Sequence, residues 1–263
     1  MSHKKLKYFL PEFLIDLLRI IKKRLITFGK LGTLKSNKRF LDRYQDDSVN
    51  ILANGPSLTN EVQESILGSK VIVMNDFFKS KYKDSFDIVA LCYAEPKESP
   101  AHNMSNVHDI LNNTNAKSYW FDISLSYKNN FKTDKEIQFI CPGFEPEIFR
   151  NKKIELTKMT LSYNTTAQMA IMVAIYMGFK KISLYGFDHD WLANPQFSKH
   201  FYSSKKDETD EWGRFSYHQQ IVIADRIWRI YSKLNEICIK EDIKITNRSI
   251  GSFLDVFDQE NHK

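Results

Sequence analysis

The chain has 263 residues, of which 42% are hydrophobic and 27% charged, so it is long and apolar enough for one large globular domain and is not a disordered protein. Residues 1–43 carry twelve Lys and Arg against three Asp and Glu, a balance of +9, so the other 220 residues carry −3 of the net +6. A nucleic-acid-binding face would need basic residues spread over the domain. Because the positive charge is confined to residues 1–43, nucleic acid is not the expected partner.

The first element is a basic amphipathic segment, in which apolar residues recur at helical spacing between Phe9 and Phe28. Charged residues interrupt the apolar face, so the run of about 20 apolar residues that a bilayer-spanning helix needs is not reached. Two interpretations stay open: residues 1–40 lie on the anionic inner face of a membrane, or they pack on the domain or on a partner chain. We predict a membrane-associating arm over residues 1–44 and a domain over residues 45–263.

The domain begins with an apolar run, residues 49–53, that predicts a buried strand and breaks into a tight turn. In this turn Gly55 lets a ligand approach the main chain, Pro56 suits the first turn of a helix, and Ser57 opens a predicted helix over 57–67. Such a turn at the carboxyl end of a parallel strand is where open α/β sheets bind nucleotides. An ordinary strand-to-helix turn is the alternative, because neither glycine-rich phosphate-binding motif is present.

Further strands and helices alternate along the chain. The predicted strands are 70–74, 87–93, 117–122, 137–141, 181–186 and 243–246, and the predicted helices are 99–113, 167–177 and 218–240. Alternation of this kind indicates a parallel sheet. The predicted fold is therefore α/β: a single α/β/α Rossmann-like domain with a mostly parallel sheet, a lid loop and the N-terminal amphipathic helical arm.

The lid is predicted over residues 191–217, a polar stretch dotted with aromatic residues. A loop of this length inside a compact domain is usually functional or disordered, and we interpret it as a substrate lid. It contains His200 and Tyr202, and His218 follows it directly.

Polar residues follow the predicted strand ends, and another polar group opens the helix at 167–177. Each group alone has a local explanation as a helix cap or a turn. The carboxyl ends of parallel strands meet at one edge, so together the groups predict one crevice. The residues that we expect to bind a nucleotide or its sugar are Asn54, Gly55, Pro56, Ser57, Asn75, Asp76, Asn164, Thr165, Thr166, Gly186, Asp188, His189 and Ser252.

Several of these motifs resemble one family. They are the stretches Ile51–Leu58, Val73–Phe78, Thr165-Thr166 before an Ala-rich helix, Met177–Ile182 and Gly186-Phe187-Asp188. In order and type they look like the bacterial sialyltransferases of glycosyltransferase family 42. They also resemble the related domain of flagellin-modifying motility accessory proteins and of archaeal hydroxymethylpterin-pyrophosphokinase-like proteins. The resemblance covers residues 49–257, with weak identity between the motifs.

The resemblance implies transfer of a sialic-acid-like sugar from a CMP-activated donor to a hydroxyl group, with inversion and without a required metal or other cofactor. It implies that Asn54, Gly55 and Ser57 contact the phosphate and ribose, that Asn75 lies near the phosphate or donor sugar, and that Thr165 and Thr166 contact the cytidine and the donor. Asp188 matches the family's aspartate.

The chain departs from the family directly after that aspartate. The family has Phe-Tyr there, and its tyrosine helps the phosphate leave, whereas this chain has His189-Asp190. Tyr202 matches a second such tyrosine. In the family the general base is a histidine just after the lid, so the resemblance implies His218 in this role, with His200 as the competitor. A histidine that titrates near neutral pH can take the acceptor's proton. Asp188 and Asp190 also form a pattern that holds a divalent cation in other sugar transferases, although the sequence does not favour a metal.

The expected function is thus a bacterial glycosyltransferase that acts on a glycan or glycolipid acceptor of lipopolysaccharide or capsule. The expected location is cytoplasmic, peripheral on the cytosolic face of the inner membrane, and three widely spaced cysteines fit a reducing compartment. The alternatives are a pyrophosphokinase-like enzyme that uses Mg-ATP at Asp188 and Asp190, and a non-catalytic nucleotide-binding subunit. The sequence leaves a homo-oligomer open.

Overall fold

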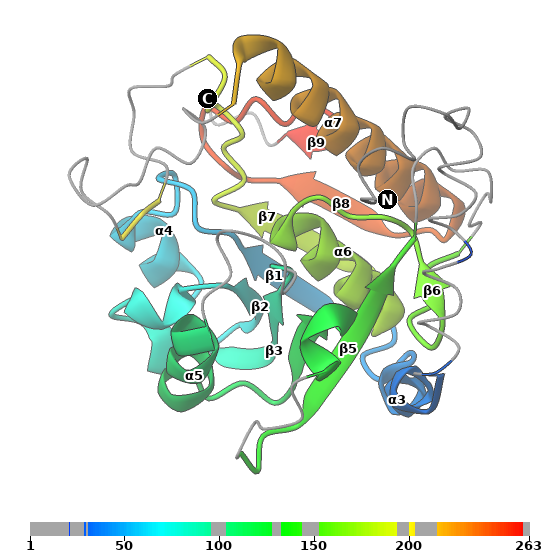
Figure 1. Cartoon of the computed structure of the whole chain (residues 1–263). Helices are drawn as coiled ribbons and strands as arrows, with labels where there is room; N and C mark the ends of the chain where they lie inside the picture. Colours follow the sequence, from blue (N-terminus) through cyan, green and yellow to red (C-terminus); the bar gives the residue numbers. More distant parts are fainter. Residues whose placement is uncertain are drawn as a thin grey trace.

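Nine parallel strands form one sheet in the order β6-β5-β4-β3-β2-β1-β7-β8-β9 in the computed structural model of the chain (Figure 1). The structure describes residues 21, 29, 31–95, 104–127, 133–143, 153–193, 200–202 and 215–259. The strands are β1 Ser48–Leu52, β2 Lys70–Met74, β3 Asp87–Tyr93, β4 Tyr119–Asp122, β5 Ile137–Pro142, β6 Met159–Thr160, β7 Lys181–Tyr185, β8 Lys244–Asn247 and β9 Asp258–Gln259.

Helices cover both faces of this sheet. They are α3 Leu31–Lys35, η1 Ser36–Phe40, α4 Asn60–Ser65, η2 Phe77–Lys79, η3 Lys83–Ser85, α5 Met104–Asn113, η4 Ile123–Tyr127, α6 Thr166–Tyr176 and α7 Tyr217–Lys240. Buried side chains of α6 and α7 belong to one hydrophobic cluster, and those of α5 belong to a second. Successive residues of a strand point to opposite faces, so Ile51 lies in the first cluster and its neighbour Leu52 in the second.

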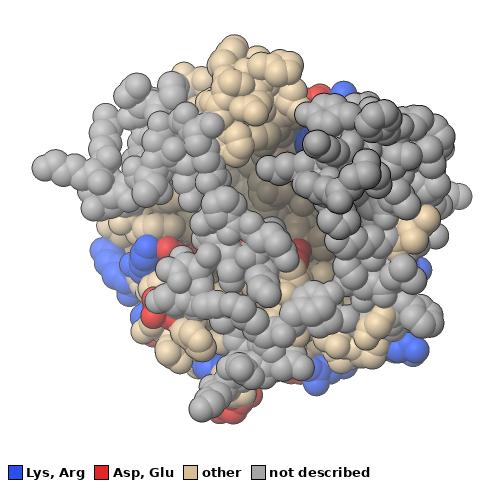
Figure 2. Space-filling model, viewed as in Figure 1, with Lys and Arg blue, Asp and Glu red and all other residues tan. Residues whose placement is uncertain are grey.

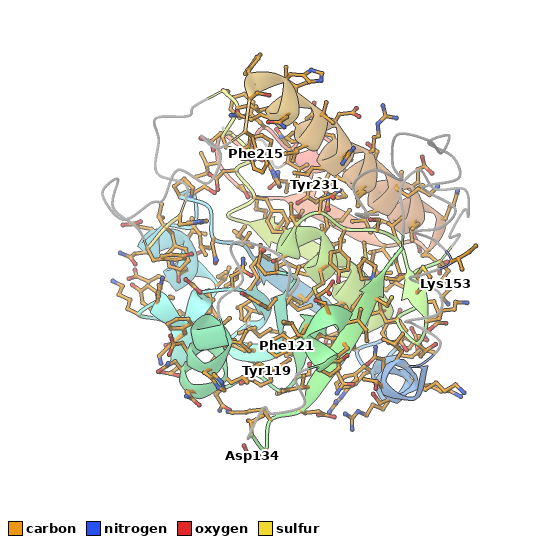
Figure 3. All side chains as sticks on the ribbon, viewed as in Figure 1. Tyr119, Phe121, Asp134, Lys153, Phe215 and Tyr231 are labelled. Carbon is orange, nitrogen blue, oxygen red and sulfur yellow. The ribbon has the colours of Figure 1, made fainter. Side chains whose placement is uncertain are left out.

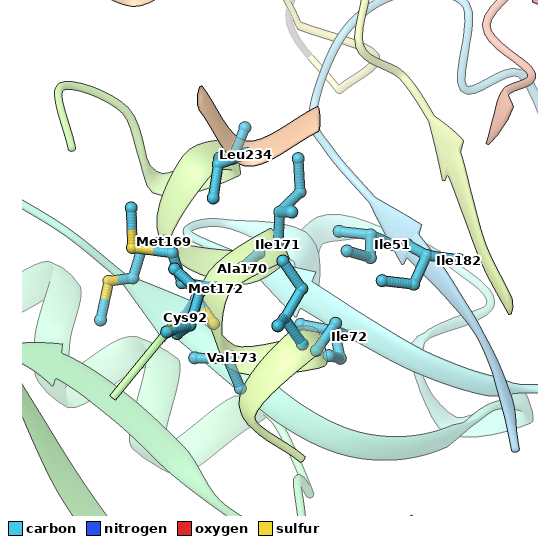
Figure 4. Close-up of a cluster of buried hydrophobic side chains, with 14 of the residues drawn as sticks. Ile51, Ile72, Cys92, Met169, Ala170, Ile171, Met172, Val173, Ile182 and Leu234 are labelled. Atoms are coloured by element: carbon cyan, nitrogen blue, oxygen red, sulfur yellow. The ribbon is translucent and has the colours of Figure 1, made fainter. Parts of the chain in front are cut away.

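Helix α6 lies at the centre of the larger cluster. All eleven of its residues are buried, because the sheet covers one side and α7 covers another. Figure 4 shows the side chains of this helix between Ile51, Ile72 and Ile182 of the sheet and Leu234 of α7. An apolar surface on all sides is typical of such a buried helix, and it fixes the position of the N-terminus of α6 near the sheet's carboxyl edge.

The strand order reverses at β1. From β1 the chain adds strands β2 to β6 on one side, and then returns through α6 to place β7, β8 and β9 on the other side. In open α/β sheets, ligands bind outside the carboxyl ends of the strands at such a reversal point. Here the two strands that meet at this point are β1 and β7, paired from Ser48 with Lys181 to Leu52 with Tyr185.

The predicted fold class is confirmed, and most predicted strands match within one or two residues. The predicted helix over 57–67 is wrong at its start, because α4 begins at Asn60 after Thr59, whose Oγ1 accepts the Val62 N–H at 3.3 Å. The Leu58 N–H instead donates to the Gly55 carbonyl at 3.0 Å and closes a turn. The two-residue strands β6 and β9 were not predicted, since two residues carry no periodic pattern.

Residues 31–44, which the sequence placed in the arm, pack against the domain. Leu34 and Phe40 are 0% exposed, and Asn37 Nδ2 donates to the carbonyls of Phe139 and Leu156, both at 2.8 Å. The predicted membrane-associating arm covers residues 1–44, and of its first thirty residues the structure describes only 21 and 29. Among the helices that the structure describes, none has the length and apolar character needed to cross a bilayer.

Candidate functional site

The turn after β1 and the turn after β7 are joined by hydrogen bonds at the carboxyl edge of the sheet. The Gly55 N–H donates to the Gly186 carbonyl at 3.0 Å, while Ser57 donates its N–H to Asp188 Oδ1 at 3.1 Å and its Oγ–H to Asp188 Oδ2 at 3.0 Å. A Cβ on Gly55 would lie 1.8 Å from Asp188 Oδ2. Glycine is therefore needed at position 55 so that the two turns can approach each other.

Asn54, at the start of the first turn, has a buried amide group that is unpaired within the described part of the chain. The residue is 6% exposed, and neither its Nδ2 nor its Oδ1 has a hydrogen-bond partner among the residues that the structure describes. Its main-chain carbonyl is paired, because it accepts the Phe201 N–H at 2.9 Å. Most buried polar side chains in proteins are satisfied, so an unpaired amide at a sheet's reversal point suits the reception of a ligand.

The end of β2 and the start of α6 form the next part of the edge. Asn75 has a left-handed backbone, with φ of 48°, and its Oδ1 accepts the hydroxyl of Thr166 at 3.1 Å. Thr165 caps α6 in a capping box with Gln168, whereas Asn164 is exposed. The N-terminus of an eleven-residue helix carries partial positive charge, so this part of the edge is suited to an anionic group. Figure 2, which is viewed from the same side as Figure 1, shows a hollow near the centre of the molecular surface, below α7.

Asp188 has an unusual titration. Burial raises the pKa of its carboxyl to about 6, against the lowering effect of the two Ser57 hydrogen bonds and with a smaller rise from the charge of Asp190. The carboxyl is thus close to half-protonated in mildly acidic solution, and it is ionised at neutral pH.

The raised pKa of Asp188 predicts how the stability of the fold depends on pH. The folded state holds the proton more tightly than the unfolded state, whose carboxyl titrates near 3.8. Protonation of Asp188 therefore raises the free energy of unfolding as the pH falls from 6 to 4. The expected rise is about 1–2 kcal/mol after allowance for the partial exposure of the carboxyl. Urea unfolding at pH 7 and pH 4.5 should show this gain in the wild type relative to Asp188→Asn. An identical pH response of the two proteins would contradict the assignment.

His189 faces α7 rather than the Asn54 turn. Its Nε2 lies 2.9 Å from the hydroxyl of Tyr231, and its ring packs edge-on against Trp228 at a centroid distance of 5.5 Å. Burial lowers the pKa of His189 to about 4, so the imidazole is neutral at physiological pH. Figure 3 shows Tyr231 between α7 and α6, where its hydroxyl also interacts with Thr165. His189 therefore ties the β7 turn to α7.

Ser252 holds the loop after β8 against the β7 turn. Its Oγ donates to the Phe187 carbonyl at 2.6 Å and accepts from Asn247 Nδ2 at 2.9 Å and from the Leu254 N–H at 3.0 Å. These three bonds occupy the usual capacity of a hydroxyl group. In this structure the side chain of Ser252 is engaged by the protein itself.

The candidate residues in and directly after the predicted lid lie in two different places. His200 and Tyr202 stack at a ring-centroid distance of 5.2 Å, and the Tyr202 ring lies under Lys79, which in turn pairs with Asp76. His218 is exposed in the first turn of α7, and no interaction that the structure describes joins it to the Asn54 turn.

Pro56 and Asp190 are half-buried beside this edge. Within the described ranges, no group of three His, Cys, Asp or Glu side chains is placed to hold a metal ion. Lys79 and Tyr231 were not predicted as part of the site. Tyr231 fits the apolar face of its helix, and no local pattern marks Lys79.

The comparisons with solved structures return glycosyltransferases. The sialyltransferase CstII from Campylobacter jejuni in complex with cytidine-5′-monophosphate is 16% identical with a TM-score of 0.44, over 82% of this chain and 85% of that chain. The sialyltransferase CST-II in complex with a trisaccharide acceptor and CMP is 16% identical with a TM-score of 0.46, over 81% of this chain and 85% of that chain.

A MAf glycosyltransferase from Magnetospirillum magneticum AMB-1 is 12% identical with a TM-score of 0.47, and 89% of this chain spans 38% of that longer chain. These neighbours are thus named as two sialyltransferase structures and one MAf glycosyltransferase. No family model and no curated protein matches the chain.

Proposed function

We propose that this protein is a glycosyltransferase that takes an acid sugar of the sialic acid type from a CMP-activated donor and transfers it to a hydroxyl of a glycan. The observation that carries the proposal is the buried, unpaired amide of Asn54 where the strand order reverses. An unpaired buried amide costs roughly 1–3 kcal/mol. A ligand that offers both a donor and an acceptor, as a nucleotide does, would satisfy both of its atoms.

The charges around Asn54 suggest how such a nucleotide lies. A carboxylate has about four acceptor sites, and Ser57 uses two of those on Asp188. The remaining sites suit the hydroxyl groups of a ribose and repel a phosphate. The N-terminus of α6, with Asn75 beside it, suits the phosphate instead. The sequence led us to expect that Asn54, Gly55 and Ser57 contact both the phosphate and the ribose, whereas this orientation leaves Ser57 and Asp188 to the ribose alone.

The motifs that resemble family 42 sialyltransferases support cytidine as the base of this nucleotide. Thermal melting with CMP, CDP, UDP, GDP and ATP, each with and without Mg²⁺, tests the proposal. We expect CMP to raise the melting temperature without metal. Stabilisation by ATP that requires Mg²⁺ would favour a phosphoryl-transfer enzyme, and the absence of any shift would favour a non-catalytic subunit; either result would overturn the proposal.

The general base of the transfer is proposed to be His218. We expect His218→Ala to lower kcat by about 100-fold or more, in the range of general base catalysis, with little change in donor KM. His108→Ala serves as the control, because His108 is exposed on α5. If His200→Ala lost the activity while His218→Ala kept it, the base would be His200.

The arm is proposed to bind anionic membranes through residues 1–30. Deleting residues 1–30 should release the protein from sedimenting vesicles that contain anionic phospholipid and leave the melting temperature unchanged. Deleting residues 1–40 should in addition destabilise the fold by about 3 kcal/mol or more, because it removes Leu34 and Phe40 from the core. Retention of the shorter deletion on vesicles would refute the membrane role.

A further inference from the structure

Lys79 connects the lid to the edge of the sheet that carries the candidate site. It lies in η2, directly after β2, and its Nζ is 4.5 Å from the centroid of the Tyr202 ring. Asp76 Oδ2 pairs with the same Nζ at 2.7 Å. An ammonium group at this distance from the face of an aromatic ring is attracted to the ring's π electrons, and Asp76 restricts where the ammonium can lie.

The segment His200–Tyr202, which we call the anchor, is docked at two further points. The Phe201 N–H donates to the main-chain carbonyl of Asn54 at 2.9 Å. The Phe201 ring packs against the second hydrophobic cluster, with its centroid 6.4 Å from that of Phe77. The anchor therefore touches the backbone of the residue whose side-chain amide is unpaired.

We infer that Lys79 is a positioning residue, which holds the anchor on the sheet edge through the Tyr202 ring and thereby fixes the backbone of Asn54. This inference deepens the proposed function and rests on it for the identity of the ligand. Because the Lys79 contact is with the face of the Tyr202 ring, it does not use the phenol hydroxyl.

The inference requires that the positive charge of Lys79, rather than its bulk, holds the anchor. Lys79→Met keeps the aliphatic length and removes the charge, whereas Lys79→Arg keeps a cation that can lie on the ring. The chain also offers a matched control: Lys81 Nζ lies 4.7 Å from the centroid of the Tyr82 ring, which is not part of the anchor.

Hydrogen exchange of the Phe201 amide reports on docking without any assay of activity. An exposed cation–π contact is worth a factor of about two to five in an equilibrium. We therefore expect Lys79→Met to speed exchange at Phe201 about two- to fivefold, Lys79→Arg to restore the wild-type rate, and Lys81→Met to leave it unchanged.

Titration of the same variants with CMP tests the link to the site. Lys79→Met should weaken CMP binding by the same factor of about two to five, since only the docked form presents Asn54 correctly. Unchanged exchange at Phe201 in Lys79→Met, or equally fast exchange in Lys79→Arg, would overturn the inference. Failure of the wild type to bind CMP would overturn the proposed function instead, and the exchange data would still decide the role of Lys79.

Discussion

Asn54→Leu is expected to melt at a higher temperature than the wild type and to lose nucleotide binding. Leucine has the same branched arrangement of side-chain heavy atoms as asparagine and carries no polar group to leave unpaired, so the substitution removes a desolvation penalty of roughly 1–3 kcal/mol. For a chain of this length that corresponds to a rise of about 2–6 °C. The leucine offers nothing to pair with a nucleotide, so CMP affinity should fall by about 100-fold or more.

Calorimetric melting and CMP titration measure the two effects on one sample. Asn50→Leu is the matched control, because Asn50 lies in β1, the strand that leads into the Asn54 turn, and its Nδ2 donates to Ser69 Oγ at 2.9 Å. Losing that bond should lower the melting temperature and leave CMP binding intact. An Asn54→Leu protein that melts below the wild type would mean that the Asn54 amide stabilises the free protein, contrary to the site described above.

Gly55→Ala is expected to disrupt the site from the backbone. The added methyl group would lie 1.8 Å from Asp188 Oδ2 and 2.4 Å from the Gly186 carbonyl oxygen, so the two turns must separate. Overpacking of this kind costs about 1–3 kcal/mol, and the separation breaks the bonds between Ser57 and Asp188. We expect a lower melting temperature and a loss of CMP affinity of about 100-fold or more.

Gly32→Ala is the control for this substitution, because a Cβ at Gly32 has no atom within 4 Å in its surroundings. A second variant separates the two clashes. Adding Asp188→Ala to Gly55→Ala removes the clash with the carboxylate but not the one with Gly186, so it should recover part of the stability and none of the binding. Wild-type stability in Gly55→Ala would show that the turns do not approach as closely as described.

Much of the fold could be predicted from the sequence because parallel strands that are buried on both faces read as short apolar runs. The runs at β2 and β3 have the predicted bounds. The start of α4 was predicted wrongly because the sequence offers two residues that could cap the helix. Ser57 and Thr59 are both good helix caps, and the contact that decides between them comes from Asp188, far along the chain.

The location of the candidate site could be predicted from the sequence, but the contacts between its side chains could not. Residues at strand ends are marked by local changes from apolar to polar, which the sequence displays. The unpaired amide of Asn54, the proton affinity of Asp188 and the contact between Lys79 and Tyr202 arise between distant segments. No spacing or composition encodes them, so they become visible only in the folded chain.

The reversal of strand order at β1 also has a consequence for synthesis of the protein on the ribosome. Ser57 and Asp188 are 131 residues apart, and β7 must be made before it can pair with β1. Synthesis proceeds at about 5–20 residues per second, so the edge of β1 that pairs with β7 stays unpaired for roughly 7–26 s. During this interval an unpaired, apolar strand edge is open to other chains. Nascent chains that stall before residue 181 should therefore depend on chaperones to avoid aggregation.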